Sequence, residues 1–375
     1  MSLIDRYIIT RFLTNFVILF LMLFIFAAAI DLLLQLDRFV EVVNLKAEDA
    51  GWFTRTIILI KVVLNFHGPR IFQFYAYMLG LLSIGAMGFT LAQMHRHKEL
   101  VAVLASGVRL HRIAVPIICA VFALNLLQLI NQEFILPKLA PLLIRNHGDI
   151  GKSGISSFAI PFSADSKGNL IQSPGFNAQA QTLEYPTILL RDESGRTIQR
   201  ISAKEAVWDE QEEGWRFTDG QVITPSAHGK DGATSSSFMQ PANEVFHTDL
   251  SPDVLTMRQH RQYAAMLSMR EIGQLMESGQ QEDTDILVRF WLARFTSVVV
   301  NMLLLVITLP FFLLREPANL LRQSFLCAST AIPVMLGALI GLTVDLPGIE
   351  PAVEVFLPGL VLIPIAMFQI TLIRT

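Results

Sequence analysis

Charged residues are scarce in this sequence of 375 residues. Asp, Glu, Lys and Arg make up 16% of it and hydrophobic residues 52%, whereas soluble domains carry about 25% charged residues. So few charges exclude a chain that is soluble throughout, because soluble domains need more charged side chains at their surface. We therefore expect much of the chain to lie in a membrane.

Cysteine and the common catalytic motifs are also rare or missing. The two cysteines, Cys119 and Cys327, both fall in long uncharged stretches, so a disulfide framework is not expected. The polar middle of the chain has no cysteine and could fold in an oxidising or a reducing compartment. The sequence contains no Gly-x-Ser-x-Gly and no His-Glu-x-x-His. We expect no catalytic residue, no metal and no cofactor in this chain.

Two weaker motifs have ordinary explanations. The Gly-Lys-Ser tripeptide at 151–153 resembles the end of a phosphate-binding loop, but the full pattern needs a glycine where this chain has Asn146. His95, His97 and His111 lack the acidic or cysteine partners of a closed zinc site. We expect the tripeptide not to bind nucleotide and the histidines to be solvated in a basic loop.

Six stretches of the chain contain no Asp, Glu, Lys or Arg, and each is 19 to 24 residues long. About 20 apolar residues at a helical rise of 1.5 Å cross the hydrocarbon core of a bilayer. One such stretch could be a buried core helix, but six indicate a membrane protein with six spans. The stretches are 12–30, 71–94, 113–132, 295–314, 323–344 and 355–373.

Four groups of basic residues at span ends fall on one side of the membrane if there are six spans and both termini lie on that side. Lys and Arg near span ends are retained in the cytoplasm, so that side is cytoplasmic. The opposite span ends are acidic or mixed, and residues from about 138 to 285 lie outside the cytoplasm. The basic residues are Arg6 and Arg11; Arg96, Lys98, Arg109 and Arg112; Arg315 and Arg322; and Arg374.

The segment from about 138 onward is polar and rich in turn residues. Short alternating runs between glycine-containing turns are typical of an antiparallel sandwich or a jelly-roll-like curved sheet. We expect Trp208 and Trp215 to fill its core. From Ser268 the pattern becomes helical, with Ile272, Leu275 and Met276 on one face. The expected strands include 187–190, 197–201, 206–208, 215–218 and 221–224.

Two shorter segments are predicted to be helices outside the spans. Residues 52–67 are apolar but carry Arg55, Lys61 and His67, which favours a helix at the membrane surface. The other segment lies in the basic loop between spans 2 and 3, at about 96–107.

In the loop helix, Leu100, Val103 and Leu104 share one face, and Glu99 lies in the first turn, where a helix dipole favours a carboxylate. Gly107 can supply a left-handed stop. Such a helix suits docking into a groove of a partner protein, but it could also be a connector on the membrane surface. The periodicity alone favours the connector.

Short motifs then follow one another along the chain, in an arrangement of three spans, an outer β-domain and three more spans. They are Ile4-Asp5-Arg6-Tyr7; Glu99-Leu100 with Ala105-Ser106-Gly107-Val108; Ile201-Ser202-Ala203; Ala206-Val207-Trp208; Gly214-Trp215; Asp219-Gly220; Asp249-Leu250-Ser251-Pro252-Asp253; Leu267-Ser268 with Glu271-Ile272; and Leu309-Pro310-Phe311. In this order they resemble the LptF/LptG permeases of the lipopolysaccharide export ABC transporter. The stretch 249–253 and the loop before span 4 look slightly more like LptG than LptF.

The resemblance implies an α-helical transmembrane fold of six spans plus an extracytoplasmic all-β jellyroll-like domain in the inner membrane. The implied organisation is spans 1–3 in residues 1–137, a periplasmic β-jellyroll in 138–266, a connecting helix and joint in 267–285, and spans 4–6 in 286–375. The implied function is a permease subunit that extracts lipopolysaccharide or a related glycolipid and passes it to a periplasmic bridge toward the outer membrane.

The resemblance also implies partners. Two such permeases pair and bind a cytosolic LptB-like ATPase dimer, which hydrolyses the ATP, so the permease itself is not an enzyme. The jellyroll passes lipid to LptC/LptA-like periplasmic jellyroll proteins. Nucleic acid has no part in this function.

Site residues follow from the same resemblance. The loop helix becomes the ATPase-coupling helix, with Glu99, Leu100, Val103, Leu104 and Gly107 as its candidate residues. Spans 1 and 5 are expected to line the lipid cavity.

Family members often carry cations near the outer end of span 1, whereas this chain has Asp31, Asp37 and Arg38 there. We take these three as the candidate edge of the substrate cavity. Asp31 could mark a pathway or be simply hydrated at the interface.

Two other classes of function are weighed against this one. A lipoprotein-release-type ABC permease usually has four spans, with the outer domain after the first, whereas three spans precede the domain here. A membrane-embedded lipid-modifying enzyme requires a cluster of titratable residues at one depth, and the sequence pattern shows none. Copurification with a cytosolic ATPase would separate the transporters from the enzyme.

Overall fold

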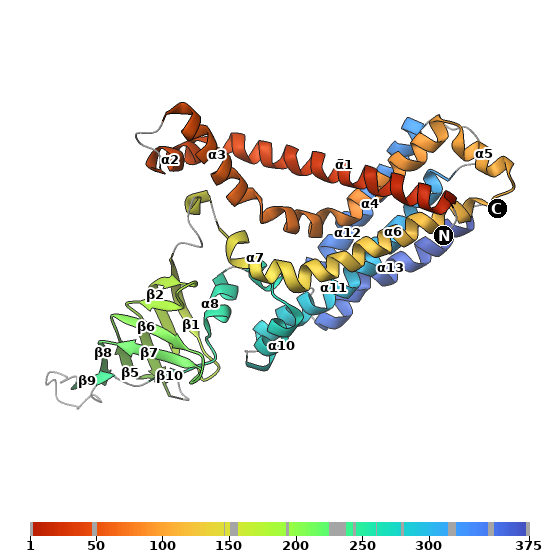
Figure 1. The fold of residues 1–375 in the computed structure, drawn as a ribbon. Coiled ribbons are helices and arrows are strands. Elements are labelled where there is room, and N and C mark those ends of the chain that lie inside the picture. The colour runs from red at the N-terminus through yellow and green to blue at the C-terminus, as the bar shows by residue number, and fades with distance from the viewer. Residues whose placement is uncertain are drawn as a thin grey trace. The chain divides into compact units, whose positions relative to one another are not determined.

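The computed structural model describes residues 3–46, 51–145, 147–150, 157–192, 195–224, 238–242, 245–259, 261–278, 281–313, 320–343 and 349–372. The tripeptide at 151–153 lies outside these residues. The chain forms two compact units (Figure 1). The helical unit comprises Met1–Phe39, Leu59–Pro137 and Val288–Thr375, and the β unit comprises Val40–Ile58 and Lys138–Leu287.

Helices account for nearly all of the described helical unit, and further helices follow the strands in the β unit. Their bounds are α1 (Leu3–Leu34), α2 (Leu36–Lys46), α3 (Trp52–His67), α4 (Arg70–Arg96), α5 (Glu99–Ala105), α6 (Leu110–Ile130), the π-helical turn η1 (Asn131–Ile135), α7 (Leu136–Leu143), the 3₁₀ turn η2 (His147–Asp149), α8 (Pro252–Gln259), α9 (Arg261–Ala264), α10 (Met269–Ser278), α11 (Gln281–Thr308), the 3₁₀ turn η3 (Leu309–Phe311), α12 (Leu320–Thr343) and α13 (Pro351–Leu372).

Five helical segments of the described chain are long and apolar enough to cross a membrane: Leu3–Leu34, Arg70–Arg96, Leu110–Leu143, Thr284–Phe311 and Pro351–Gln369. Three of the six predicted spans lie wholly within these segments, and two more, 295–314 and 355–373, lie mostly within them. The predicted span 323–344 falls almost wholly within α12, a helix of 24 residues. A helical membrane part is therefore confirmed, and the count of six spans stays a prediction.

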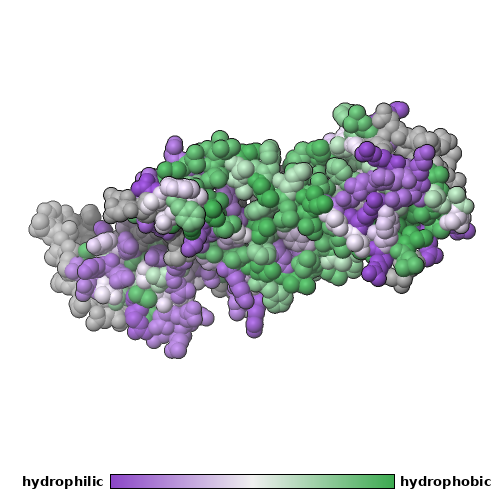
Figure 2. All heavy atoms as spheres, turned by 45° about the horizontal axis from the view of Figure 1, so that its top comes forward, coloured by the Kyte–Doolittle hydropathy of each residue, from purple (hydrophilic) through white to green (hydrophobic). Residues whose placement is uncertain are grey.

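The surface of the helical unit is apolar where a soluble protein would be polar. On the face in view in Figure 2, hydrophobic residues cover the middle of this unit, and hydrophilic residues gather toward its α5 end. On α1, Ile25 and Phe26 are each 63% exposed. An exposed apolar surface of this extent is stable only against lipid or another apolar partner.

Helix α1 buries one narrow stripe of its surface. Ile8, Phe12 and Phe16 recur every four residues and are almost completely buried. The helix packs against α4 and α6, while α12 packs against α13 (Figure 1). Many other apolar side chains of α1 are exposed, Ile18, Met22 and Leu33 among them, so the helix also has a wide apolar face directed away from the core.

The β unit contains one antiparallel sheet. Its strands are β1 (Phe158–Ala164), β2 (Leu170–Asn177), β3 (Thr182–Glu184), β4 (Thr187–Arg191), β5 (Thr197–Ser202), β6 (Glu205–Asp209), β7 (Gly214–Thr218), β8 (Gly220–Thr224), β9 (Phe238–Ala242) and β10 (Val245–His247). Their order is β10-β7-β6-β3-β2-β4-β5-β8-β9, with β1 on β2. All five expected strands are confirmed, within one residue at each end.

The sheet is a meander of long strands that bend along one line. Strands β3 and β4 pair with β2 in one continuous register, so together they form one long strand with a bend between them. Strands β5 and β6, and strands β7 and β8, pair with their neighbours in the same way. The bends lie side by side, because the Tyr185 amide donates to Lys204 O (2.9 Å) and the Lys204 amide to Thr218 O (3.2 Å). Tyr185 and Asp219, at φ 48° and 52°, turn the backbone out of the strand conformation. A curved β domain is confirmed, and its assignment as a jellyroll stays a prediction.

Trp215 is the centre of the β-unit core. It is fully buried, its ring lies 6.2 Å from that of Phe176, and its indole N–H donates to Leu250 O at 3.0 Å. Trp208 packs edge-on against it, with ring centroids 5.1 Å apart, but remains partly exposed. The core position predicted for both tryptophans is therefore confirmed for Trp215 and only partly for Trp208.

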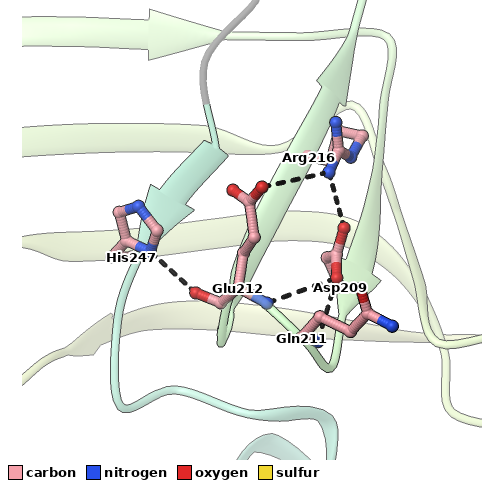
Figure 3. A network of polar contacts seen from close by, with 5 residues as sticks. All are labelled: Asp209, Gln211, Glu212, Arg216 and His247. Carbon is pink, nitrogen blue, oxygen red and sulfur yellow. Dashed lines mark hydrogen bonds and ion pairs between the residues drawn. The ribbon is translucent and has the colours of Figure 1, made fainter.

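The turn between β6 and β7 is tied to β10 by polar contacts (Figure 3). Asp209 accepts hydrogen bonds from the Gln211 and Glu212 amides, and Arg216 donates to its other oxygen at 2.6 Å. The Arg216 hydrogen bond is the main reason that the pKa of Asp209 lies below its usual range. His247 Nδ1 lies 2.7 Å from Glu212 O. Strand β10 is thus fixed to the β6–β7 turn in addition to its backbone pairing with β7.

The predicted helix after the strands is α10. Ser268 and Glu271 cap its first turn, because the Ser268 amide donates to Glu271 Oε2 at 2.7 Å and the Glu271 amide donates to Ser268 Oγ at 3.2 Å. Ile272 and Leu275 are buried and Met276 is half-buried, which confirms the predicted apolar face.

Candidate functional site

The predicted coupling helix is α5, and it is shorter than the expected 96–107. It begins at Glu99 because Lys98, at φ 57°, is left-handed and cannot continue α4. It ends at Ala105, and Gly107 at φ 79° provides the left-handed stop that the sequence predicts.

The apolar face of α5 is directed into the chain itself. Leu100 is completely buried, and Val103 and Leu104 are half-buried against the core of the helical unit. The opposite face carries Val101 at 51% exposure and the exposed Ala102. The three predicted residues share one face, as expected, but here they anchor α5 to its own bundle and leave the opposite face open.

Glu99 is held by two residues of α1. Tyr7 Oη donates to Glu99 Oε2 at 2.8 Å, and Arg11 Nη1 donates to the same oxygen at 2.8 Å. The Arg11 and Glu99 side chains are 29% and 31% exposed. Tyr7 and Arg11 are one helical turn apart, so both reach the same point. The sequence did not predict this contact, although the four-residue spacing of Tyr7 and Arg11 places both side chains on one face of α1.

A pocket of about 260 Å³ lies toward the other end of α1. His67 Nε2 lies 3.6 Å and Arg70 Nη1 3.8 Å from Asp31 Oδ2. The His67 side chain is only 8% exposed, whereas that of Asp31 is 32% exposed. The pocket is lined by Phe24, Ala27, Ala28 and Asp31 of α1, His67 of α3, and Arg70, Gln73, Phe74 and Tyr77 of α4.

Two of the three residues predicted for the cavity edge lie elsewhere. Asp37 and Arg38 are exposed on α2, beyond the break at Gln35, and do not line this pocket. The basic side chains beside Asp31 belong instead to His67 and Arg70, and the sequence did not predict either of them. Gly68 lies between them, and a Cβ there would be 2.5 Å from Leu64 O, so the tight α3–α4 turn requires glycine.

Helix α11 carries two arginines that pair with acids of other helices. Arg289 donates to Glu354 of α13 at 2.6 Å, and Arg294 donates to Glu133 of the π-turn η1 at 3.1 Å. The side chains of Glu354 and Arg294 are 1% and 2% exposed. Glu133, Arg294 and Glu354 directly flank uncharged stretches of the sequence. The two ion pairs join α11 to η1 on one side and to α13 on the other.

A ladder of amides continues this connection inside the unit. Asn301 of α11 donates to Asn125 of α6 at 3.1 Å, and Asn131 donates to Phe72 O of α4 at 3.0 Å. Asn125 and Asn131 are nearly fully buried. A Cβ at Gly80 of α4 would collide with Asn301 Oδ1, so the glycine permits close approach of α4 and α11.

An apolar cavity of about 310 Å³ lies between α1, α4 and α12. Leu19 and Leu23 form its α1 wall, and Cys327 and Ala331 belong to its α12 wall. Its lining thus includes the helices of predicted spans 1 and 5, the two spans expected at the lipid cavity.

Metal ligation has no geometric basis in the described part of the chain. Within those residues, no three His, Cys, Asp or Glu side chains are grouped to hold an ion. His95 Nε2 lies 3.0 Å from Phe312 O, so this ring nitrogen is engaged by a backbone carbonyl.

The chain has several apolar membrane helices, an antiparallel β domain between them in sequence, and a short helix attached to α1. These features define the class of a multi-pass membrane protein with a β domain. The sequence matches the family described as "Lipopolysaccharide export system permease LptF/LptG" over residues 6–373. The chain therefore belongs to the LptF/LptG family and is an inner-membrane permease subunit of lipopolysaccharide export. No curated protein matches the sequence.

Proposed function

We propose that this chain is one half of an ABC permease that extracts lipopolysaccharide, or a related glycolipid, from the inner membrane and delivers it to a periplasmic bridge. The observation that carries the proposal is the position of α1. One end of this helix holds Glu99 of α5 through Tyr7 and Arg11, and its other end contributes Asp31 to a pocket. A single helix thus connects the ATPase-facing loop with a candidate lipid site.

The proposed topology has six spans, both termini in the cytoplasm and the β unit in the periplasm. The basic residues beside α4, α5 and α12 support this orientation. It places α5 in the cytoplasm, where an LptB-like ATPase dimer would dock. It also places Asp31, His67 and Arg70 toward the periplasmic surface.

In this function α5 is the coupling helix. Its open face offers Val101 and Ala102 to the groove of the ATPase, while Leu100, Val103 and Leu104 fasten the helix to the bundle. Closure of the ATPase would displace α5, and the Glu99 contacts would carry that displacement into α1. The permease performs no chemistry on ATP or on the lipid.

The remaining partners follow from the surfaces. The exposed apolar face of α1, with the α12 wall of the apolar cavity, would meet a second permease of the same family around the lipid. The β unit ends in β1 on one side and in β9 and β10 on the other. Strand edges of this kind pair with other strands, so they suit LptC/LptA-like bridge proteins.

Copurification and a charge reversal test the proposal. The tagged chain and its partner permease should copurify with a cytosolic ATPase, and Glu99→Lys should lower lipid transport at least about tenfold because a cation next to Arg11 repels it. Glu210→Lys, an equal charge change on an exposed turn of the β unit, is the matched control. A transporter with Glu99→Lys and undiminished transport would refute the coupling role of α5.

A further inference from the structure

The pocket around Asp31 combines an arginine, a histidine, a carboxylate and aromatic rings in one small space. We propose that it binds a lipid headgroup of the phosphoethanolamine type, with a phosphate and an ammonium a few atoms apart. This inference rests on the proposed lipid-handling function and adds to it the chemistry of the headgroup. The phosphate would meet Arg70 and His67, and the ammonium would meet Asp31.

The side chains of Arg70 and His67 both contact aromatic rings. Arg70 Cζ lies 3.8 Å from the centroid of Phe66, at cation–π distance. The His67 ring is stacked on Phe39, with centroids 6.0 Å apart, and meets Phe66 edge-on at 5.3 Å. A guanidinium fixed in this way can bind two phosphate oxygens in a fork without first being ordered.

Asp31 is the feature that selects the headgroup. An ionised carboxylate disfavours a simple phosphate, because a like charge beside the anion is repulsive. Asp31 lies 3.6 Å and 3.8 Å from the His67 and Arg70 nitrogens, near the limit for ion pairs, and is 32% exposed. Such pairs add little to stability, so a zwitterion can replace the internal pairs with two of its own at low cost.

The walls of the pocket fit a small headgroup at the membrane surface. The small side chains of Ala27 and Ala28 leave space on the α1 side of the pocket beside Asp31. The rings of Phe24 and Phe74 form an edge-to-face pair with centroids 5.6 Å apart. Tyr77 is 57% exposed and can face the ammonium with its ring. A volume of about 260 Å³ is slightly below the usual range of about 300–1,000 Å³ for drug-sized ligands, so the pocket takes a headgroup and not a whole glycolipid.

Binding of defined lipids to the purified full chain in detergent tests this inference. The probes are short-chain phosphatidylethanolamine, phosphatidylglycerol and phosphatidic acid, with soluble O-phosphoethanolamine and inorganic phosphate beside them. The unmodified protein should bind phosphatidylethanolamine about tenfold more tightly than the two anionic lipids. Both soluble probes should bind more weakly than the lipid, because the site lies at the membrane surface.

Variants separate the two halves of the site. Asp31→Asn should abolish the preference for phosphatidylethanolamine while phosphatidic acid still binds, and Asp31→Glu should keep that preference. Arg70→Gln should weaken all phosphate-bearing lipids. Asp37→Asn and Arg38→Gln make the same charge changes on exposed α2 and should leave binding unchanged. Thermal unfolding of each variant confirms that it is folded.

Three outcomes would overturn the inference: equal affinity of the unmodified protein for zwitterionic and anionic lipids, loss of preference in Asp37→Asn equal to that in Asp31→Asn, or soluble O-phosphoethanolamine binding as tightly as the lipid. These measurements use the permease without the ATPase. A missing preference with intact copurification therefore refutes the headgroup assignment alone. Failed copurification with an intact preference refutes the permease proposal instead.

Discussion

Arg11 Nη1 lies 2.8 Å from Glu99 Oε2, and this contact joins α1 to α5 across 88 residues of sequence. Helix α1 continues without a break from Arg11 to Asp31, a distance of about 30 Å at the helical rise. Because a helix transmits axial displacement, movement of α5 would reach the Asp31 pocket through α1. In the proposed function, α1 would connect the two candidate sites mechanically within one chain.

The first prediction concerns Arg11. Arg11→Gln should reduce ATP-driven lipid transport about three- to tenfold, because Glu99 loses its charged partner and keeps only the Tyr7 hydrogen bond to α1. The free energy of unfolding should fall by no more than about 1 kcal/mol, since the pair is partly exposed. Transport into acceptor vesicles and thermal unfolding measure the two effects. Arg6→Gln, on the exposed side of the same helix, is the control, and an equal loss in both variants would contradict the prediction.

The second prediction concerns the approach of α4 and α11. Gly80→Ala should destabilise the protein by about 1–3 kcal/mol, because the new methyl group collides with Asn301 Oδ1. Gly337→Ala in α12 has open space around its Cβ and should be neutral or stabilising by up to about 1 kcal/mol. Thermal unfolding in detergent compares the two. Adding Asn301→Ala to Gly80→Ala should recover part of the loss, and no recovery would show that the collision is not the cause.

The third prediction concerns the Arg289–Glu354 pair. Glu354→Gln should destabilise the helical unit by about 3–5 kcal/mol, because it neutralises the buried carboxylate that pairs with the Arg289 guanidinium. Replacing both residues by Met should restore most of that loss. Glu350→Gln, one turn earlier and exposed, should have little effect. A double-mutant cycle by thermal unfolding measures the coupling, and additive losses would argue against an energetically important pair.

The fourth prediction concerns alkaline pH and the β unit. Burial, with the nearby Asp253 carboxylate, raises the pKa of Tyr263 above its usual value. Below the ordinary tyrosine pKa of about 10 the phenol is protonated in both states, so its contribution is complete. As pH rises above that value, the unfolded chain loses the proton first and stability decreases.

Tyr263→Phe should remove part of this alkaline decrease. At neutral pH it should cost about 0.5–1.5 kcal/mol, since the hydrogen bond to Asp253 Oδ1 at 3.2 Å is lost. Tyr185→Phe, at a tyrosine that is 63% exposed, should leave the alkaline slope unchanged. Tryptophan fluorescence during thermal unfolding between pH 7 and pH 11 measures both slopes. Equal slopes in all three proteins would refute the assignment to Tyr263.

Local patterns in the sequence predict the elements of this fold well. Uncharged stretches indicate the membrane helices because the free energy of moving a segment from water into lipid depends on its own residues. The five expected strands follow from alternating apolar residues and from turn residues. The limits of α5 were less well predicted. Lys98 takes a left-handed conformation that its residue type does not favour, so the helix begins three residues later than expected.

The composition of the sites was less predictable than their location. Glu99 and Asp31 are visible in the sequence as charges in unusual places, but their partners come from other helices. Arg11, His67 and Arg70 acquire their roles only when α1 packs beside α4 and α5. Conversely, Asp37 and Arg38 are close to Asp31 in sequence but lie past the break at Gln35 and do not line this pocket.

The sequence by itself determined that this protein is a membrane permease with a β domain between two sets of spans. Its charge-free stretches and ordered motifs carry that information independently of packing. Only the tertiary structure decided which charges meet, because an ion pair depends on the distance between side chains on different helices. The same holds for the folded sheet, whose aligned bends at Tyr185, Lys204 and Asp219 arise from the register of strands that are distant in sequence.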